Sequence, residues 1–265
     1  MKSIWVPVSG QIAQQQKVDT IANNIANANT TGFKKDDLIF KEYLTQLENP
    51  SDDIDIPRGE FSPDDFYRSQ GAENAKVKVA GSYTDFSQGS LVPTQNPLDL
   101  ALKGPGFLEI STENGIRFTR KAALSLNSQS ELVTADGAHV LAAGQGDAEN
   151  RKIKLDSQKP ISIDGKGNIF QGENQISQLS IVEFNDVHAL RKSENLNFIN
   201  IDQANKKESN ELTVVHQGFL ESSNVNAIGE MSELIKAHRH FDTIQKAIQA
   251  YDAINVKAAN DLARF

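Results

Sequence analysis

Apolar residues recur at every third or fourth position near the start of the chain. This spacing places them on one side of a helix and predicts an amphipathic terminal helix within residues 1–35. Pro7 suits its first turn, and Gly32 suits the position after its end, near Asn29. The apolar positions are Ile4, Val8, Ile12, Val18, Ile21, Ala22, Ile25 and Ala28.

A longer periodic segment occupies the other end of the chain. From residue 234 onwards, apolar residues alternate at steps of three and four, which is the heptad pattern of a coiled coil. Asn224 or Asn226 can cap this helix, which would be roughly 55 Å long at 1.5 Å per residue. One heptad position holds Leu234, Phe241, Ile248, Asn255 and Leu262, and the other holds Ala237, Ile244, Tyr251, Ala258 and Phe265.

Between about residues 76 and 215 the period of the pattern changes to two. Short alternating runs are separated by turn sequences at Asn114-Gly115, Asp136-Gly137 and Asp164–Asn168. Such runs predict short strands joined by hairpins. No helical pattern long enough for a crossover separates them, so we expect a β-rich domain and not a parallel α/β sheet.

Residues 36–75 lie between the first helix and the β-rich region. Acidic pairs and three prolines, of which Pro50 is the first, predict an extended arm or loop in the later part. In the earlier part the helical spacing continues, so we expect helix through Leu38, Phe40, Tyr43, Leu44 and Leu47.

These elements predict an α+β fold. We expect the N- and C-terminal helices to pack as a coiled-coil-like inner domain, with the β-rich domain inserted between them. The expected boundaries are an N-terminal helix in 1–35, an arm or linker in 36–75, a β-rich outer domain in 76–215 and a C-terminal helix in 216–265.

Composition and charge narrow the class of protein. A chain of 265 residues with 38% hydrophobic content can bury a core. The net charge of −8, without a basic stripe, argues against a nucleic-acid partner. Because the chain has no cysteine, disulfides and thiolate metal sites are excluded. We also expect neither a membrane span nor a cleaved signal peptide, because no long apolar run is present.

The sequence presents no recognisable catalytic, cofactor or metal site. His238 and His240 are two positions apart on the predicted helix, so they point in different directions and do not share a metal. The glycines of Gly104–Gly106 and Gly144–Gly146 lack the strand and helix of a phosphate-binding loop. Because 35 acidic residues offer many carboxylate pairs and none stands out, a hydrolase on a β scaffold stays an alternative.

Three segments resemble the bacterial flagellar basal-body rod and hook protein family. "VDTIANNIANANTTGFKK" is similar to the N-terminal signature of the family, including Asn23, Asn24, Gly32 and Lys34. "QGFLESSNVNAIGEMSELIKAHRHFDTIQKAI" is similar to its C-terminal signature, although Asp242 replaces the more usual Glu. "QGSLVPTQNPLDLALKGPGFLEI", with "FTRKAALSL" and "ELVTADGAHVL", resembles its central domain, although Ala122-Ala123 replace a common glycine.

The resemblance implies a structural subunit and not an enzyme. Members of the family are exported without cleavage through the flagellar type III apparatus and polymerise helically in the periplasm with other axial proteins. The result is the rod, a drive shaft that transmits torque from the motor to the hook. The resemblance implies no cofactor, no small-molecule substrate and no membrane insertion.

The branch of the family is less sharply indicated. The central domain is unlike the smaller rod proteins and the chain is short for a hook subunit, which leaves the proximal-rod F type and the distal-rod G type. The proximal-rod branch, of the F type, is favoured because the extended insertion after the first helix that is associated with the distal rod is not present. A distal-rod subunit of the G type, or a hook-like axial subunit, is the alternative. A secreted adhesin with a coiled-coil stalk is a further alternative from outside the family.

The asparagines of the first helix lie close to its apolar positions, although asparagine is a mediocre helix former. A buried asparagine that pairs with another can fix the register of packed helices. We therefore expect Asn23, Asn24 and Asn27 to pair across subunits. The full expected subunit interface is Val18, Ile21, Asn23, Asn24, Ile25, Asn27, Leu234, Phe241, Ile244, Ile248, Tyr251, Asn255 and Leu262.

Overall fold

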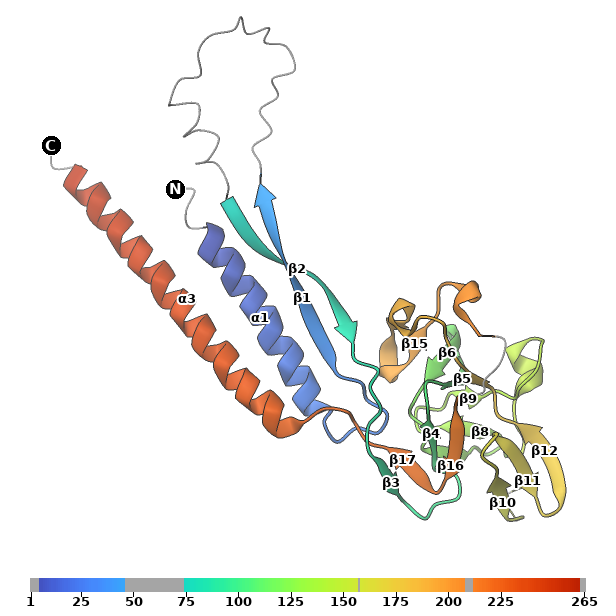
Figure 1. Ribbon diagram of the computed structural model, residues 1–265. Coiled ribbons are helices and arrows are strands. Elements are labelled where there is room, and N and C mark those ends of the chain that lie inside the picture. The colour runs from blue at the N-terminus through green and yellow to red at the C-terminus, as the bar shows by residue number, and fades with distance from the viewer. Residues whose placement is uncertain (1–4, 46–73, 157, 208–211, 263–265) are drawn as a thin grey trace, which may run out of the picture. The chain divides into compact units, whose positions relative to one another are not determined.

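The computed structural model describes residues 5–45, 74–156, 158–207 and 212–262. Their order of elements confirms the α+β class, with an N-terminal helix, a β-rich central region and a C-terminal helix (Figure 1). The described chain divides into two compact units. A helical unit draws on Met1–Ala22, Asp37–Tyr83 and Gly229–Phe265, and a β-rich unit draws on Asn23–Asp36 and Thr84–Ile228.

The helical unit contains most of two helices and of a two-stranded ribbon. Helix α1 spans Trp5–Ala26, with Pro7 in its first turn as predicted, and α3 spans Ala227–Leu262. The 36 residues of α3 correspond to about 54 Å at 1.5 Å per residue. Figure 1 shows α1 alongside α3, and strands β1 (Asp36–Thr45) and β2 (Asn74–Thr84) as a ribbon beside α1.

The helix expected through Leu38 and Phe40 is wrong, because these residues lie in strand β1. The backbone groups of β1 pair with β2, which begins 29 residues after β1 ends (74 − 45). Local spacing does not show so distant a partner, and the aromatic and β-branched residues Ile39, Phe40 and Tyr43 also suit a strand. Leu47 and the prolines of the expected arm lie outside the described residues.

The first helix ends earlier than the glycine predicted. Helix α1 stops at Ala26, and turns follow up to Gly32. Gly32 has a φ of +69°, and its amide donates to the carbonyl of Glu221 at 2.8 Å. A Cβ atom there would stand 2.7 Å from the backbone nitrogen of Lys121. The glycine is therefore required by a close approach of two chain segments and not by the end of the helix.

The β-rich unit consists of small antiparallel sheets. Every strand pair described in this unit is antiparallel, so the expectation of a β-rich domain without a parallel sheet is confirmed. The largest sheet has the order β14-β15-β6-β5-β9-β8-β7, with β13 also paired to β5. The smaller sheets are β10-β11-β12, β16-β4 and β17-β3. The strands are β3 (Leu91–Pro93), β4 (Leu100–Lys103), β5 (Phe107–Thr112), β6 (Gly115–Thr119), β7 (Leu124–Leu126), β8 (Leu132–Thr134), β9 (His139–Val140), β10 (Ile161–Ile163), β11 (Asn168–Gln171), β12 (Asn174–Gln178), β13 (Ile181–Val182), β14 (Arg191–Lys192), β15 (Phe198–Ile199), β16 (Val214–Gln217) and β17 (Phe219–Glu221).

The three predicted hairpin turns are confirmed. Asn114-Gly115 lies at the turn between β5 and β6, and Asp136-Gly137 lies between β8 and β9. Asp164–Asn168 joins β10 to β11, and the Asp164 carboxylate accepts hydrogen bonds from the amides of Lys166 and Asn168. Local turn chemistry therefore determines these connections.

Two apolar clusters form the core of the β-rich unit. In the larger one, Leu100, Leu108 and Val140 are fully buried. The smaller cluster is aromatic: Phe107 packs edge to face against Phe184, with ring centroids 5.7 Å apart. Burying one such aliphatic or aromatic side chain contributes about 1.5–3 kcal/mol to folding.

Candidate functional site

The predicted heptad seam coincides with the least exposed face of α3. Between residues 234 and 248, the five seam positions are buried or partly buried, and every other side chain of this stretch is exposed. Ala237 is only 1% exposed. The other four positions, Leu234, Phe241, Ile244 and Ile248, are partly buried.

Helix α1 covers part of this seam within the helical unit. The Gln14 amide donates to the carbonyl of Ala237 at 3.3 Å. Gly10 lies so close to α3 that a Cβ atom there would be 3.9 Å from the Cδ1 atom of Ile244. On α1, Val18 and Ile21 are 8% and 6% exposed, so much of their apolar surface is already covered by the chain itself.

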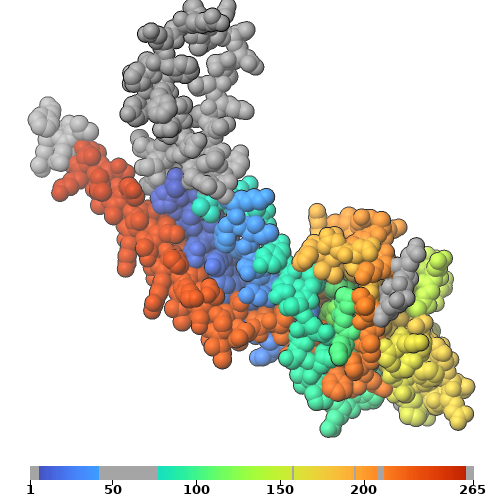
Figure 2. Space-filling model, in the orientation of Figure 1, coloured from blue at the N-terminus to red at the C-terminus, as the bar shows by residue number. Residues whose placement is uncertain are grey.

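Beyond Ile248 the same helix leaves its apolar side chains exposed. Tyr251, Ile254 and Val256 are 48%, 63% and 61% exposed, and Asn255 is exposed as well. Figure 2 shows these last turns of α3, in red, extending past α1 on the visible face. The side chain of Leu262 lies outside the part of the chain that the structure describes.

More apolar surface is exposed near the start of α3. Met231 and Ile235 are 48% and 57% exposed, and Ile12 on α1 is 58% exposed. Apolar side chains exposed repeatedly along one helix are typical of a surface that binds another protein. The described part of the helical unit therefore carries the candidate assembly surface.

Asn24 is buried and forms hydrogen bonds within its own chain. It is 1% exposed, and its amide pairs with the backbone of Asp36 in both directions: Nδ2 donates to the Asp36 carbonyl at 2.9 Å, and the Asp36 amide donates to Oδ1 at 3.1 Å. Asn27 donates to the carbonyl and side chain of Asn23, one turn earlier. Ile25 is partly buried beside them. In this conformation the Asn24 amide joins the end of α1 to the start of β1.

A buried ion-pair cluster joins the three segments that carry the family resemblance. Lys34 Nζ lies 2.6 Å from Glu221 Oε1, and Arg120 Nη1 lies 3.3 Å from Glu221 Oε2. The three side chains are between 1% and 3% exposed. Lys34 also donates to the carbonyl of Ser87 at 2.7 Å, and the Gly89 amide donates to Glu221 Oε1 at 3.0 Å.

Two buried cations share one carboxylate in this cluster. Burial lowers the pKa of Lys34 below its ordinary value, while the nearby Glu221 carboxylate opposes that shift. Burial also lowers the pKa of Arg120, again against the effect of Glu221. Arg120 further donates to the carbonyls of Leu102 and Gly104. Glu221 is thus the group on which both cations depend.

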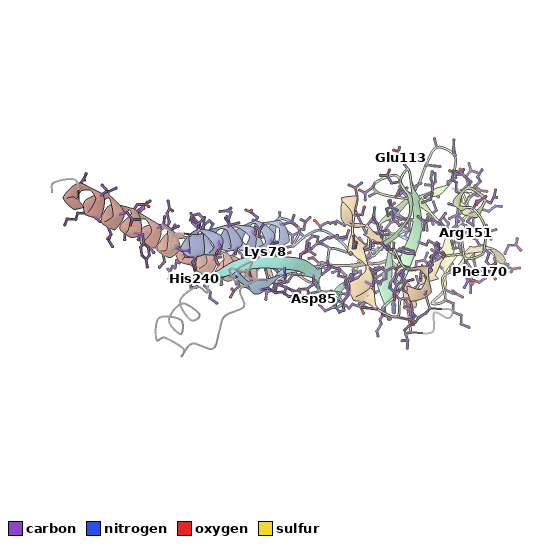
Figure 3. All side chains as sticks on the ribbon, turned by 90° about the horizontal axis from the view of Figure 1, so that it is seen from above. Lys78, Asp85, Glu113, Arg151, Phe170 and His240 are labelled. Atoms are coloured by element: carbon purple, nitrogen blue, oxygen red, sulfur yellow. The ribbon has the colours of Figure 1, made fainter. Side chains whose placement is uncertain are left out.

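Asn224 ties the start of the C-terminal segment to two other segments. Its Oδ1 accepts from the Lys35 amide at 2.8 Å, and its Nδ2 donates to the carbonyl of Asp85 at 2.8 Å. The Asp85 amide in turn donates to the carbonyl of Lys35 at 2.8 Å. Figure 3 labels Asp85, the residue that follows β2. Of the two asparagines proposed to cap α3, Asn224 has this other role, and Asn226 directly precedes the helix.

Sequence reasoning missed Lys34, Arg120, Glu221 and Asn224 as site residues. A signal was present, because a lysine and a glutamate stand close after Gly32 and Gly218 in the two signature segments. Within the described residues no group of three or more His, Cys, Asp and Glu side chains is arranged to hold a metal. His238 and His240 are exposed on α3, and no helix of the described chain is long and apolar enough to cross a membrane.

Three segments of the chain match known protein families. Residues 5–34 match the family described as flagella basal body rod protein. Residues 101–171 match the flagellar hook protein FlgE/F/G D1 domain, and residues 216–262 match the flagellar basal body rod FlgEFG protein C-terminal region. The first and last matches contain Lys34 and Glu221, and the middle one contains Arg120.

Curated relatives match over almost the entire chain. The chain is 33% identical to the flagellar basal-body rod protein FlgG of Bacillus subtilis, over 98% of each chain. It is 28% identical to the flagellar basal-body rod protein FlgF of Caulobacter vibrioides, over 99% of this chain and 98% of the relative. It is also 32% identical to FlgF of Rhizobium meliloti, over 91% of this chain and 89% of the relative.

Proposed function

Because this chain belongs to the flagellar basal-body rod protein family and is a structural subunit of the rod, we propose that many copies polymerise helically into a periplasmic drive shaft. The shaft transmits torque from the motor to the hook. The interface between copies uses the apolar faces of α1 and α3, packed as a coiled-coil-like inner layer with the β-rich unit outside it.

The observation that carries this proposal is the exposed continuation of the α3 seam. Tyr251 is 48% exposed in the single chain and Ala258 is exposed as well, although both continue the heptad pattern that is covered up to Ile248. An isolated helix end gains little stability from propensity alone, so it orders fully when neighbouring helices cover it. Repeated head-to-tail contacts that do not close on themselves give an open helical assembly.

The proximal-rod branch is our first candidate, and the distal-rod or hook-like role is the second. Relatives named FlgF and FlgG match the chain over nearly the same span, so both roles are compatible with its length and segment order. Location in the rod could be read directly, by labelling the subunit and measuring its distance from the inner membrane in purified basal bodies.

Assembly with other flagellar axial proteins follows from membership of the family. We propose that the subunit reaches the basal body uncleaved through the flagellar type III export apparatus, and that it has no enzymatic activity. The helical unit is suited to export, because helices that order only on assembly resist unfolding little.

The test places a charge on the exposed seam. Tyr251→Asp should leave the thermal unfolding of the purified monomer unchanged and abolish motility when it replaces the wild-type chain in a rod-deficient strain. Gln249→Asp, an exposed polar position two residues away, is the matched control and should restore motility. Normal motility with Tyr251→Asp would contradict the proposed interface.

A further inference from the structure

Asp36 is a point at which several chain segments meet within the β-rich unit. Its backbone pairs with the Asn24 amide at the end of α1, as described above. Its carboxylate accepts a hydrogen bond of 2.7 Å from the Thr84 hydroxyl at the end of β2. The other carboxylate oxygen lies 2.6 Å from Lys192 Nζ. The first residue of β1 is therefore bound to the end of α1, the end of β2 and a distant lysine.

Lys192 contacts three of the four residues from Phe33 to Asp36. It lies in β14, at the edge of the largest sheet, 156 positions after Asp36. Besides its ion pair, Nζ donates to the carbonyl of Lys34 at 3.2 Å and lies 4.3 Å from the ring centroid of Phe33. One side chain thus fixes the path of the segment through a carboxylate, a carbonyl and an aromatic face.

These contacts lie where the chain passes between units. The chain changes from one unit to the other at four positions, here called passages, which lie after Ala22, Asp36, Tyr83 and Ile228. On the β-rich side, Asn24 and Thr84 bind Asp36, while Asn224 binds Lys35 next to it. Three of the four passages therefore have a partner in the segment Lys35–Asp36, and the fourth begins directly after this segment.

We propose that Lys192 and Asp36 are a positioning pair for assembly: they hold the segments that lead into the helical unit in one arrangement on the β-rich unit. This inference rests on the proposed function, because it assigns these residues a role in polymerisation. Neither residue belongs to the buried cluster around Glu221, and neither lies on the exposed helix face.

The exposure of the pair separates positioning from general stability. Both side chains are 23% exposed, and a partly exposed ion pair contributes little to the global stability of a domain. Its effect is local, because the ammonium group has three fixed partners within a segment of four residues. Loss of the pair should therefore loosen residues 33–36 without unfolding the sheet.

The first experiment measures amide hydrogen exchange on the full-length monomer with Lys192→Met and with Asp36→Asn. Methionine keeps the apolar stem over Phe33 and removes the charge. The amides of Lys35, Asp36 and Asp85 should exchange about tenfold faster, as expected when a charge-assisted hydrogen bond that restrains the segment is lost. The Leu141 amide, bonded to the Glu109 carbonyl in the sheet, should not change.

Lys206→Met is the matched control. Lys206 also lies over a phenylalanine, 5.2 Å from the Phe118 ring centroid, and 3.4 Å from the Glu109 carboxylate. Neither of these partners lies in residues 33–36, so the amides of that segment should keep their protection. Equal acceleration in the control variant, or no acceleration in either test variant, would overturn the positioning pair.

The second experiment replaces the wild-type chain with each variant in a rod-deficient strain. Lys192→Met and Asp36→Asn should be produced and exported normally but form rods at least tenfold less often, and Lys192→Arg should restore them. Normal rods from variants with faster exchange would overturn the role in assembly and leave the proposed function standing. Failure of the wild-type chain to form rods would instead count against the proposed function, whatever the exchange result.

Discussion

The β-rich unit and the helical unit differ in how completely they bury their apolar side chains. In the β-rich unit, Leu100, Leu108 and Val140 are completely covered by the unit itself. On α3, by contrast, Ala237 is the only fully buried hydrophobic residue described, while Ile235 and Ile254 are more than half exposed. Within the described residues, the β-rich unit therefore has a core of its own, whereas α3 leaves most of its apolar side chains exposed, as the proposed polymerisation requires.

The two units also treat charge differently. The β-rich unit buries Glu221 between Lys34 and Arg120. Such an arrangement is stable only while each buried charge has an opposite charge beside it. The ion pair described on α3, between Lys236 and Glu233, joins exposed residues three positions apart. Changes in the β-rich unit should therefore alter the stability of the single chain, and changes on α3 should alter assembly.

The largest expected effect comes from Glu221→Ala. Without the carboxylate, Lys34 and Arg120 are buried cations without their counter-charge, and the expected cost is about 3–5 kcal/mol in the free energy of unfolding. Urea unfolding followed by circular dichroism measures it. Glu113→Ala, at an exposed turn of the same unit, should cost almost nothing. Equal free energies of unfolding for the two variants would show that the ion-pair cluster does not stabilise the folded chain.

Paired truncations test the comparison directly. Leu132, fully buried in the β-rich core, should cost roughly 2–5 kcal/mol when changed to alanine, because a cavity remains. Ile254→Ala on α3 should change monomer stability by less than about 0.5 kcal/mol, since the side chain is already exposed. In cells, at normal protein levels, Ile254→Ala should reduce rod formation more than Leu132→Ala does. A large loss of monomer stability from Ile254→Ala would show that the helical unit buries its own core.

Asn24→Leu tests whether the signature asparagine acts within the chain. The substitution removes both hydrogen bonds to Asp36 and should destabilise the monomer by about 1–3 kcal/mol. The exposed neighbour Asn23 provides the control, because Asn23→Leu should leave the monomer unchanged. Thermal unfolding distinguishes the two. If Asn24→Leu left monomer stability intact but disturbed rods, pairing across subunits would be the better explanation.

The smallest expected effect concerns acid stability. Burial alone would raise the pKa of Glu109, but hydrogen bonds from Arg151 and Ser180 and the nearby Lys206 outweigh it, so this pKa lies below its ordinary value. A lowered pKa stabilises the folded chain above the ordinary value of about 4.3, and this contribution is lost as the pH falls through the folded-state pKa. Arg151 is labelled in Figure 3.

Glu109→Gln should therefore lose less stability than the wild-type chain between about pH 6 and pH 3, by roughly 1 kcal/mol. Unfolding in urea at several pH values measures the difference. Identical acid dependence of the two proteins would show that Glu109 is protonated equally easily in the folded and unfolded chains.

Several features could be predicted because they depend on neighbours in sequence. The hairpins at Asn114-Gly115 and Asp164–Asn168 follow from turn chemistry within five residues. The covered face of α3 from Leu234 to Ile248 follows from the heptad spacing, because helical periodicity alone decides which side chains share a face.

Other features depend on partners that lie far away in the chain. Strand β1 forms because β2 provides its hydrogen-bonding partners. Asn24 can be buried because its amide forms hydrogen bonds with the backbone of Asp36. The Lys34–Glu221 pair joins residues 187 positions apart. The local sequence pattern does not predict contacts between residues so far apart, since the packing of the whole unit sets their geometry.

The α+β class, the two terminal helices, the covered face of α3 and the family could be read from the sequence alone, whereas strand β1 could not. Each of the first four depends on periodicity, on turn residues or on motifs that are continuous along the chain. That Glu221 forms ion pairs with both Lys34 and Arg120 is visible only in the tertiary structure. The same holds for the ion pair between Asp36 and Lys192. The physical reason is that buried charges and amides are satisfied by whichever groups folding brings close, whatever their separation in sequence.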